Sequence, residues 1–381
     1  MIDIHNFDDI RPYQDHEVRA LIDKILQLPF FDSLMRQFFP NKEPELLKGA
    51  FKRIDTIFDF QTKVIYPIIK KLTSDTSTKL SQTGFKRIEQ GVPYLFISNH
   101  HDIILDPSVL NMILYERGFN TTKVAIGDNL LKKEWIRDLA RLNKSFIVHR
   151  APSIKEAIYY SQRLSNYIKK TIIEDNESVW IAQREGRAKD GNDVTQVSLL
   201  KMLAYGGDED KFEYLKSLNF LPIAISYEYD PCDILKVKEI MAKEKDIHYQ
   251  KSEEADEISM LTGLTGYKGG IHISIGKVIH NEFDDIIHHD TTKEQFNSLA
   301  ATIDEQIQSN IRLWPTNYIA YDMLMGMETY RKEYSDEEKL KFSQYIQNKL
   351  EMNQLDDEES KIRLLSIYAN PVKNKIRLTQ F

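Results

Sequence analysis

The pattern of apolar and polar residues changes near residue 85. From about Asp15 to Asp75, apolar residues recur three and four positions apart and prolines interrupt them, which predicts an N-terminal helical domain. The segment 73–84 is rich in serine and threonine and has almost no apolar residue, so we expect a linker there.

Beyond this segment, short apolar runs rich in β-branched and aromatic residues alternate with helical patterns. Strands are expected at residues 94–99, 122–127, 145–150, 178–183, 220–229 and 270–279. Helices are expected between them at residues 107–118, 132–142 and 153–175. This alternation predicts an α/β domain whose mixed, largely parallel sheet is flanked by helices.

Helical patterns resume after the last expected strand. Ser335 and Glu338 have the spacing of a capping box, which predicts that a helix begins there. We therefore expect three parts: a helical domain with its linker at residues 1–85, an α/β domain at 86–335, and a C-terminal helical extension at 336–381.

The composition narrows the function. The formal charge of −7 over 381 residues argues against a protein that coats nucleic acid. The single cysteine, Cys232, excludes an internal disulfide, and its acidic neighbours argue against an activated thiolate. No window approaches the ~20 apolar residues of a membrane-spanning helix, and the N-terminus has no signal-peptide pattern. The expectation is a cytoplasmic protein, either soluble or peripheral on the inner face of the membrane.

One segment is a candidate for membrane contact. Residues 26–40 contain Phe30, Phe31, Phe38 and Phe39, which could meet a lipid surface or an acyl chain. The alternative is that these rings form the core of the helical domain.

Candidate chemistry lies where the first expected strand of the α/β domain ends. The loop after it contains His100, His101, Asp102 and Asp106, and active sites of α/β sheets collect in such loops. A neutral histidine can accept a proton from a hydroxyl group, and a carboxylate can fix its tautomer, a pairing that serves acyl transfer to an alcohol. The alternative is a polar loop in which Asp106 caps the next helix.

Two further strand ends carry cationic side chains. Arg150 follows one strand, and another is followed by a cluster around a glycine: Arg184, Glu185, Gly186, Arg187 and Lys189. A glycine allows the backbone to approach a phosphate, and guanidinium groups pair with phosphate oxygens. The alternative is a solvated charged turn.

The order of these segments resembles a known family. The blocks "SNHHDIILD", "FIVHR", "QREGRAKDG" and "LPIAISYEY" resemble, in order and spacing, four blocks of the glycerol-phosphate and lysophosphatidate acyltransferase family. The resemblance covers roughly residues 86 to 285 and does not explain the N-terminal helices by itself.

The resemblance implies a role for each matching residue. His100 or His101 would be the general base, oriented by Asp106, with Asp102 as an alternative partner. Arg150 and the cluster from Arg184 to Lys189 would hold the anionic head of the acceptor, and Pro222 would shape the wall behind it. The Asn-His pair of the family matches Asn99 and His100, whereas its His-to-Asp spacing matches His101 and Asp106, so both histidines remain candidates.

The implied reaction is direct transfer from acyl-CoA or acyl carrier protein to a glycerol phosphate or lyso-lipid hydroxyl, without a covalent acyl-enzyme. We expect no bound cofactor and no metal. Partners would be the thioester donor, including acyl carrier protein, and the lipid acceptor, with no nucleic acid.

Two alternative functions remain. His288, His289 and Asp290 repeat the His-His-Asp order, which fits a metal-dependent hydrolase using both clusters. A non-catalytic lipid-binding protein on the same fold is the second rival, since a fold does not fix an activity.

Overall fold

The chain divides into two compact units. The computed structural model describes residues 4–39, 42–150, 153–207, 210–246, 248–252, 254–355 and 357–378, without the side chains of residues 34 and 37. Unit 1 comprises Met1–Asp75 and Pro107–Trp180, and unit 2 comprises Thr76–Asp106 and Ile181–Phe381. These units differ from the expected three-part order, because each is assembled from segments far apart in the sequence.

Unit 1 contains the expected N-terminal helices. These are α1 (Asp15–Leu26), α2 (Phe31–Phe38), α3 (Pro44–Phe51), α4 (Ile57–Phe60), the π-helical segment η1 (Gln61–Ile65) and α5 (Tyr66–Thr76), which ends in unit 2. Phe31 is a buried member of their apolar core, and Phe39 packs against that core. Phe30 is exposed and meets Trp135 edge-on at 5.1 Å between ring centroids. The alternative that the rings of residues 26–40 form the core of the helical domain is therefore confirmed for Phe31 and Phe39. Pro40 lies outside the described residues.

The rest of unit 1 is α/β. It holds most of α6 (Leu105–Glu116), then β3 (Lys123–Gly127), α7 (Glu134–Leu142), β4 (Ser145–Val148), α8 (Ile154–Lys169) and the π-helical segment η4 (Lys170–Glu174). β3 pairs in parallel with β4 and with the first residues of β5 (Val179–Ala182).

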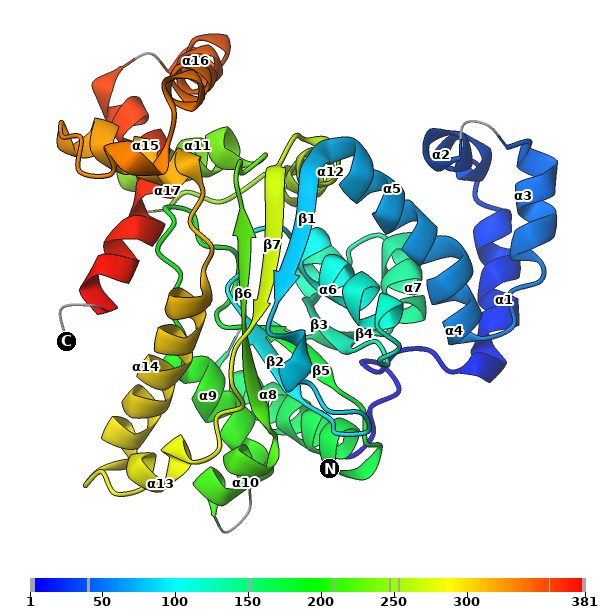
Figure 1. The fold of residues 1–381 in the computed structure, drawn as a ribbon. Helices are drawn as coiled ribbons and strands as arrows, with labels where there is room; N and C mark the ends of the chain where they lie inside the picture. The colour runs from blue at the N-terminus through cyan, green and yellow to red at the C-terminus, as the bar shows by residue number, and fades with distance from the viewer. Residues whose placement is uncertain are drawn as a thin grey trace. The chain divides into compact units, whose positions relative to one another are not determined.

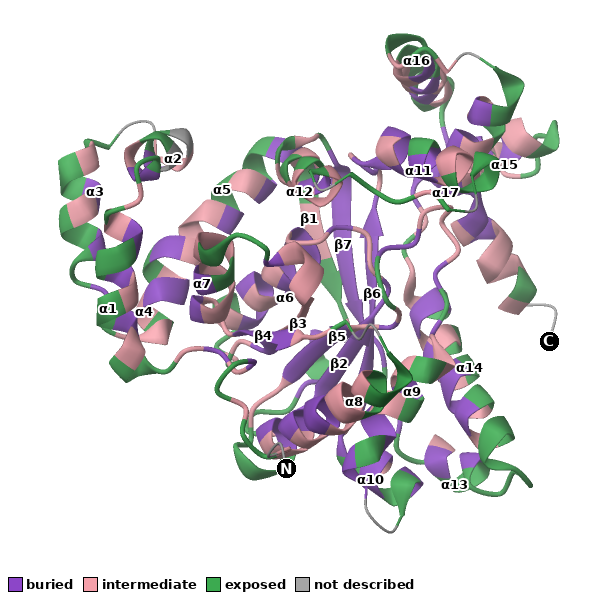
Figure 2. Ribbon diagram, turned by 180° about the vertical axis from the view of Figure 1, so that it is seen from behind, coloured by how far each residue is buried: buried purple, intermediate pink, exposed green. Residues whose placement is uncertain are grey.

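Unit 2 contains the strands β1 (Ser77–Thr83), β7 (Gly269–Ile275), β6 (Phe220–Tyr227) and β2 (Leu95–Ser98), which are neighbours in this order. Only the β6–β7 pair is antiparallel among the pairings described here. β6, β7 and β2 are buried along their whole length, as Figure 2 shows, which accounts for the apolar runs of β6 and β2. In β7, isoleucines alternate with His272 and Ser274. The seven strands of the described residues form a mixed, largely parallel sheet with flanking helices, which confirms the predicted fold class.

The predicted linker is wrong. Residues 77–83 form β1, which lies beside β7 in parallel register (Figure 1). Its hydroxyl groups face polar side chains of β7: Ser81 Oγ lies 2.8 Å from His272 Nδ1, and Thr83 Oγ1 donates to Ser274 Oγ at 2.8 Å. An edge strand that makes polar contacts has no apolar run, so its sequence resembles a linker.

The helices of unit 2 follow the sheet strands. They are α9 (Val197–Leu203), α10 (Lys211–Ser217), α11 (Asp233–Lys245), α12 (Ala255–Thr265), α13 (Glu282–Ile286), α14 (Thr292–Asn310), α15 (Pro315–Met325), α16 (Asp336–Met352) and α17 (Glu358–Leu378). The capping box is confirmed, since Ser335 Oγ accepts from the Glu338 N–H at 3.2 Å. α16 and α17 share a buried cluster with Ile234, Val237 and Ile319, so the C-terminal helices pack on the expected α/β domain.

None of the helices in the described part of the chain is both long enough and apolar enough to cross a membrane.

Candidate active site

The loop between β2 and α6 is fixed to β6 by an asparagine side chain. Asn99 Nδ2 donates to the Ile225 carbonyl oxygen, and Asn99 Oδ1 accepts from the Ile225 N–H, both at 2.8 Å. The amide thus continues the β2–β6 pairing by one residue beyond Ser98. This explains why an Asn precedes the histidines, because its side chain copies the hydrogen-bonding pattern of a peptide group.

Asp106 is the centre of the site. Its Oδ2 accepts from His100 Nδ1 at 2.9 Å, from the His101 N–H at 2.7 Å and from the Asp102 N–H at 3.0 Å. Its Oδ1 accepts from the Tyr227 hydroxyl group at 2.9 Å. The side chain is completely buried. Burial by itself raises the pKa of a carboxyl group, but the hydrogen bonds from the His100 ring and from the Asp102 N–H keep the pKa of Asp106 below its ordinary value.

The ionised Asp106 sets the tautomer of His100. A carboxylate only accepts hydrogen bonds, so the proton of the neutral imidazole must lie on Nδ1. The lone pair is then on Nε2, the nitrogen that can accept a proton from a hydroxyl group. The His100 N–H also donates to Asp193 Oδ2 at 2.7 Å, so the backbone of the histidine is held as well as its ring.

His101 has a different environment. Its Nε2 lies 2.9 Å from Asn99 Nδ2, an amide donor, so this ring nitrogen is an acceptor engaged within the loop. Its ring meets Tyr227 edge-on at 5.7 Å. Burial, followed by the positive charge of Lys236, lowers the pKa of His101, so its ring is neutral at pH 7. Of the two candidate histidines, His100 is the one whose ring pairs with Asp106.

Asp102 caps the helix instead of Asp106. Its Oδ1 accepts from the Ile104 N–H at 2.9 Å and from the Leu105 N–H at 2.7 Å. Since α6 begins at Leu105, Asp106 lies inside the first turn, and its predicted alternative role as N-cap is wrong. α12 approaches Asp102 so closely that a Cβ at Gly263 would lie 1.9 Å from Asp102 Oδ2, which explains a glycine there. Burial and the charge of Asp106 raise the pKa of Asp102.

The cationic cluster follows β5. Gly186 has a φ of +69°, a left-handed conformation that a glycine adopts without strain, and it turns the chain between the exposed Glu185 and the buried Arg187. The Glu185 N–H donates to Gln196 Oε1 at 2.7 Å. This turn therefore directs an arginine inward.

Arg187 lies in the electrostatic environment of the loop between β2 and α6. Burial lowers its pKa, but the negative charges of Asp230 and Asp102 outweigh this and keep the pKa of Arg187 above its ordinary value. Buried Nη1 of Arg187 and buried Nε of Arg184 have no hydrogen-bond partner among the described residues. Two buried donors without an acceptor are suited to an anionic ligand.

The other predicted residues lie less centrally. Lys189 pairs with Glu239 at 2.9 Å, and burial followed by the charge of Arg187 lowers its pKa to about 8. Arg150 lies in unit 1, after β4, and its N–H bonds Asp128 Oδ2 at 3.3 Å. Pro222 lies in β6, opposite Ile97 of β2. Burial raises the pKa of Cys232 to about 11, which keeps it a thiol.

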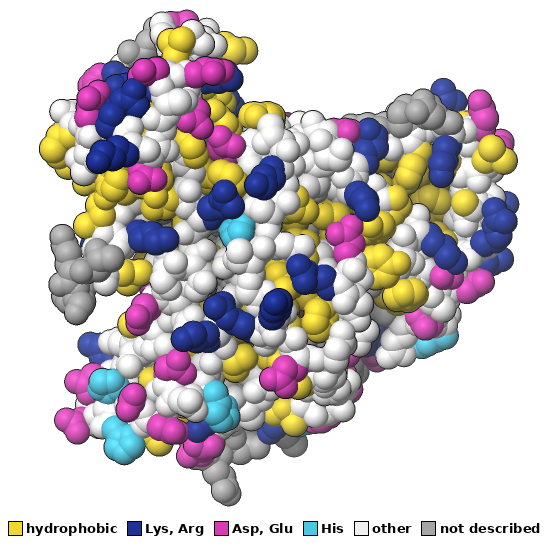
Figure 3. All heavy atoms as spheres, viewed as in Figure 1, with side chains coloured by type: hydrophobic (Ala, Val, Ile, Leu, Met, Phe, Trp, Pro, Cys, Tyr) yellow, Lys and Arg dark blue, Asp and Glu magenta, His cyan; other side chains and the backbone are white. Residues whose placement is uncertain are grey.

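The second histidine cluster is on the surface. Histidine side chains gather over α13 in Figure 3, and His288, His289 and Asp290 are exposed. Among the described residues, no group of three or more His, Cys, Asp or Glu side chains is arranged to hold a metal ion. The helix after this cluster, α14, is capped by Thr291, whose Oγ1 accepts from the Glu294 N–H.

Two residues that contact the candidate site, Tyr227 and Asp193, were not predicted from the sequence. Tyr227 reads as the last apolar residue of a buried strand, although a tyrosine at the carboxyl end of such a strand can turn its hydroxyl group toward a site. Asp193 lies in a turn, and nothing in its spacing relates it to His100.

Part of the chain matches the model of a known protein family. Residues 79–199 match the family model described as acyltransferase. This part of the chain is similar to the acyltransferase family. The matched range contains His100, Asp106 and the Arg184–Lys189 cluster. A search of the curated proteins finds no match.

Among solved structures, this chain is similar to the 1-acyl-sn-glycerophosphate acyltransferase PlsC from Thermotoga maritima. The two share 11% identity over 76% of this chain and 95% of that chain, with a TM-score of 0.36. A similarity this distant carries no information about the substrate of the present protein.

Proposed function

We propose that this protein transfers a fatty acyl group from an acyl thioester to the hydroxyl group of a glycerol-phosphate-type or lyso-lipid acceptor, with His100 as general base and Asp106 as its orienting partner. The observation that carries the proposal is the 2.9 Å bond between His100 Nδ1 and the buried Asp106 carboxylate, within a domain of the acyltransferase family.

The proposed reaction has two steps. His100 Nε2 takes the proton of the acceptor hydroxyl group while its oxygen attacks the thioester carbonyl carbon, and the carbonyl oxygen becomes an oxyanion. When the oxyanion collapses, the carbon–sulfur bond breaks and the thiolate leaves with the proton from His100. Asp106 stabilises the imidazolium between the two steps, because its negative charge lies next to Nδ1.

Arg187 and Arg184 are the proposed contacts for the anionic head of the acceptor. Both have buried nitrogens without a partner among the described residues, and guanidinium groups match phosphate geometry. Gly186 and Lys189, which follow β5 in the same cluster, would complete this contact. The donor is acyl-CoA or acyl carrier protein, and a cytoplasmic location with peripheral membrane contact belongs to the same proposal.

An acceptor panel tests the function. Thioester loss is measured with palmitoyl-CoA and palmitoyl acyl carrier protein, each offered glycerol 3-phosphate, lysophosphatidate and a lyso-aminolipid. We expect one acceptor to accelerate thioester loss, His100→Ala to abolish that acceleration, and His288→Ala, a surface control, to keep it. If acceptor binds the protein but no donor and acceptor pair reacts, the non-catalytic lipid-binding alternative is correct.

A further inference from the structure

Unit 1 contains a cavity that the proposed reaction does not use. Its volume is about 580 Å³, and every residue that lines it belongs to unit 1. None of the candidate site residues around His100 or Arg187 lines it. The volume lies within the range of roughly 300–1,000 Å³ that is typical of sites for small organic ligands.

One part of the cavity wall is apolar. It comes from α4 and η1, with Ile57, Phe58 and Ile65, and from one face of α6, with Met112 and Tyr115. The Phe58 and Tyr115 rings meet edge-on at 6.1 Å, and Phe58 is 62% exposed, so an aromatic ring reaches solvent at the edge of this wall. A wall of this kind accepts a hydrocarbon chain.

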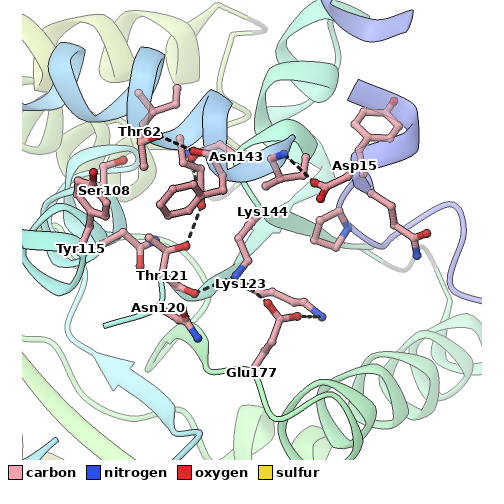
Figure 4. A pocket seen from close by; sticks show the side chains of 18 of the residues that line it. Asp15, Thr62, Ser108, Tyr115, Asn120, Thr121, Lys123, Asn143, Lys144 and Glu177 are labelled. Atoms are coloured by element: carbon pink, nitrogen blue, oxygen red, sulfur yellow. Dashed lines mark hydrogen bonds and ion pairs between the residues drawn. The ribbon is translucent and has the colours of Figure 1, made fainter. Parts of the chain in front are cut away.

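The opposite part carries charge. Lys123 Nζ lies 2.7 Å from Glu177 Oε2, and Lys144 Nζ lies 2.8 Å from Glu177 Oε1 (Figure 4). Lys170 pairs with Asp175. Three lysines therefore face two carboxylates, which leaves one excess positive charge where β3, β4 and β5 begin. The other two charged residues of the lining, Arg11 and Asp15, have opposite charges and leave this sum unchanged; Arg11 pairs with Glu17, and Asp15 accepts from the Ile57 N–H.

The backbone is irregular around this cavity. The two π-helical segments of the described residues, η1 and η4, both contribute to it, with Gln61 from one and Lys170 from the other. Lys144 has a φ of +60°, a left-handed conformation that a lysine rarely adopts. π-helical turns and strained residues are frequent at functional sites and persist only where the surrounding structure holds them.

The polar contacts hold this irregular wall in place. Gln61 Nε2 donates to Asn143 Oδ1 at 3.2 Å, and Thr121 Oγ1 donates to Gln61 Oε1 at 2.8 Å. Lys144 Nζ donates to the Thr121 carbonyl oxygen at 3.0 Å. η1 is thus tied to the chain segments that precede β3 and β4, so the apolar wall and the charged end belong to one built structure.

We propose that this cavity binds a long-chain carboxylate, a free fatty acid, with its chain against the wall of α4, η1 and α6 and its carboxylate at Lys123, Lys144 and Lys170. A single anionic head matches the single excess positive charge, and the apolar wall matches the chain. Each methylene group that leaves water strengthens binding about fourfold.

Equilibrium dialysis of the full chain with radiolabelled hexadecanoate tests this site, with octanoate and hexadecan-1-ol as comparison ligands. The test variant is Lys170→Glu, and the control is Lys169→Glu, which makes the same charge change on the neighbouring residue that does not line the cavity. We expect one hexadecanoate per chain, a loss of at least about tenfold in affinity for Lys170→Glu, and less than about twofold for Lys169→Glu. Octanoate should bind at least about 100-fold more weakly than hexadecanoate.

Other outcomes overturn the proposal. Absence of hexadecanoate binding, equal losses in both lysine variants, or equal affinity for hexadecan-1-ol would each contradict it. If Lys170→Glu does not fold, the alcohol comparison and Lys170→Gln, with an expected loss of about threefold, decide the matter. His100→Ala separates the two sites: retained hexadecanoate binding supports this proposal even if acyl transfer fails, and lost binding shows that the fatty acid occupies the catalytic site.

Discussion

Replacement of Asp106 by Asn tests the electrostatic core of the site. Oδ2 accepts three hydrogen bonds and Oδ1 accepts one, from the Tyr227 hydroxyl group. An amide can direct its oxygen to the three donors and its NH2 group to Tyr227, whose hydroxyl oxygen can accept. The Asn variant therefore keeps the shape and the tautomer of His100 but removes the negative charge.

The size of the effect follows from that charge. Two unit charges about 4 Å apart interact by about 4 kcal/mol when the effective dielectric constant is about 20. In the proposed mechanism this interaction stabilises the imidazolium of His100 in the transition state, so we expect its loss to lower kcat by about three orders of magnitude. The assay is steady-state thioester consumption with saturating acceptor, together with circular dichroism to confirm that the variant is folded.

Tyr227→Phe is the matched control. It removes the bond to Oδ1 but leaves the charge and the bond between His100 and Asp106. We expect Tyr227→Phe to lower kcat by about tenfold or less, since one hydrogen bond to a charged group is worth about 1.5–3 kcal/mol and acts here mainly on folding. A folded Asp106→Asn variant that keeps kcat within about tenfold of wild type would refute the reasoning.

Three further predictions concern other groups. His101→Ala should lower the free energy of unfolding in urea by about 2–4 kcal/mol, because it leaves the Asn99 amide without its 2.9 Å contact, while kcat stays within about tenfold; a catalytic loss as large as that of His100→Ala would contradict this. Arg187→Lys should raise the KM for an anionic acceptor about tenfold in steady-state kinetics, with kcat nearly unchanged, because the forked guanidinium is lost; an unchanged KM would remove Arg187 from the acceptor site. Burial raises the pKa of Asp304 to about 6, so its favourable contribution is complete below about pH 4 and is lost as the pH rises through about 6. Asp304→Asn keeps both bonds that Oδ1 accepts from Thr195 and should stabilise the chain by about 2–3 kcal/mol at pH 8 and by little at pH 4; equal effects of Asp304→Asn at both pH values in urea unfolding would contradict this.

The fold was readable from the sequence where strands are buried on both faces. The strands at residues 95–98 and 220–227 are largely apolar runs, and the strand at residues 269–275 carries an isoleucine at every second position from 271 on. β1 was not readable, because the side chains of this edge strand contact β7 through hydroxyl groups and form no apolar run. The two compact units could not be predicted either, because local sequence patterns do not show that residues 107–180 assemble with residues 4–75.

The site was readable as a set of residues but not as a geometry. Spacing placed His100, His101, Asp102 and Asp106 in one loop, yet it did not show which histidine turns toward which carboxylate. That choice depends on Asn99, which engages His101 Nε2, and on Asp106, which bonds His100 Nδ1. The cavity of unit 1 was not predictable, because its lining comes from distant segments whose residues carry no motif.

The central claim is that His100, oriented by Asp106, is the base for acyl transfer. Single-turnover thioester consumption, with the acceptor that supports turnover in wild type, measures this directly in His100→Ala and His101→Ala side by side. The account predicts that acceptor-dependent thioester loss disappears in His100→Ala and persists in folded His101→Ala. Persistence in His100→Ala, or equal loss in both folded variants, would contradict it.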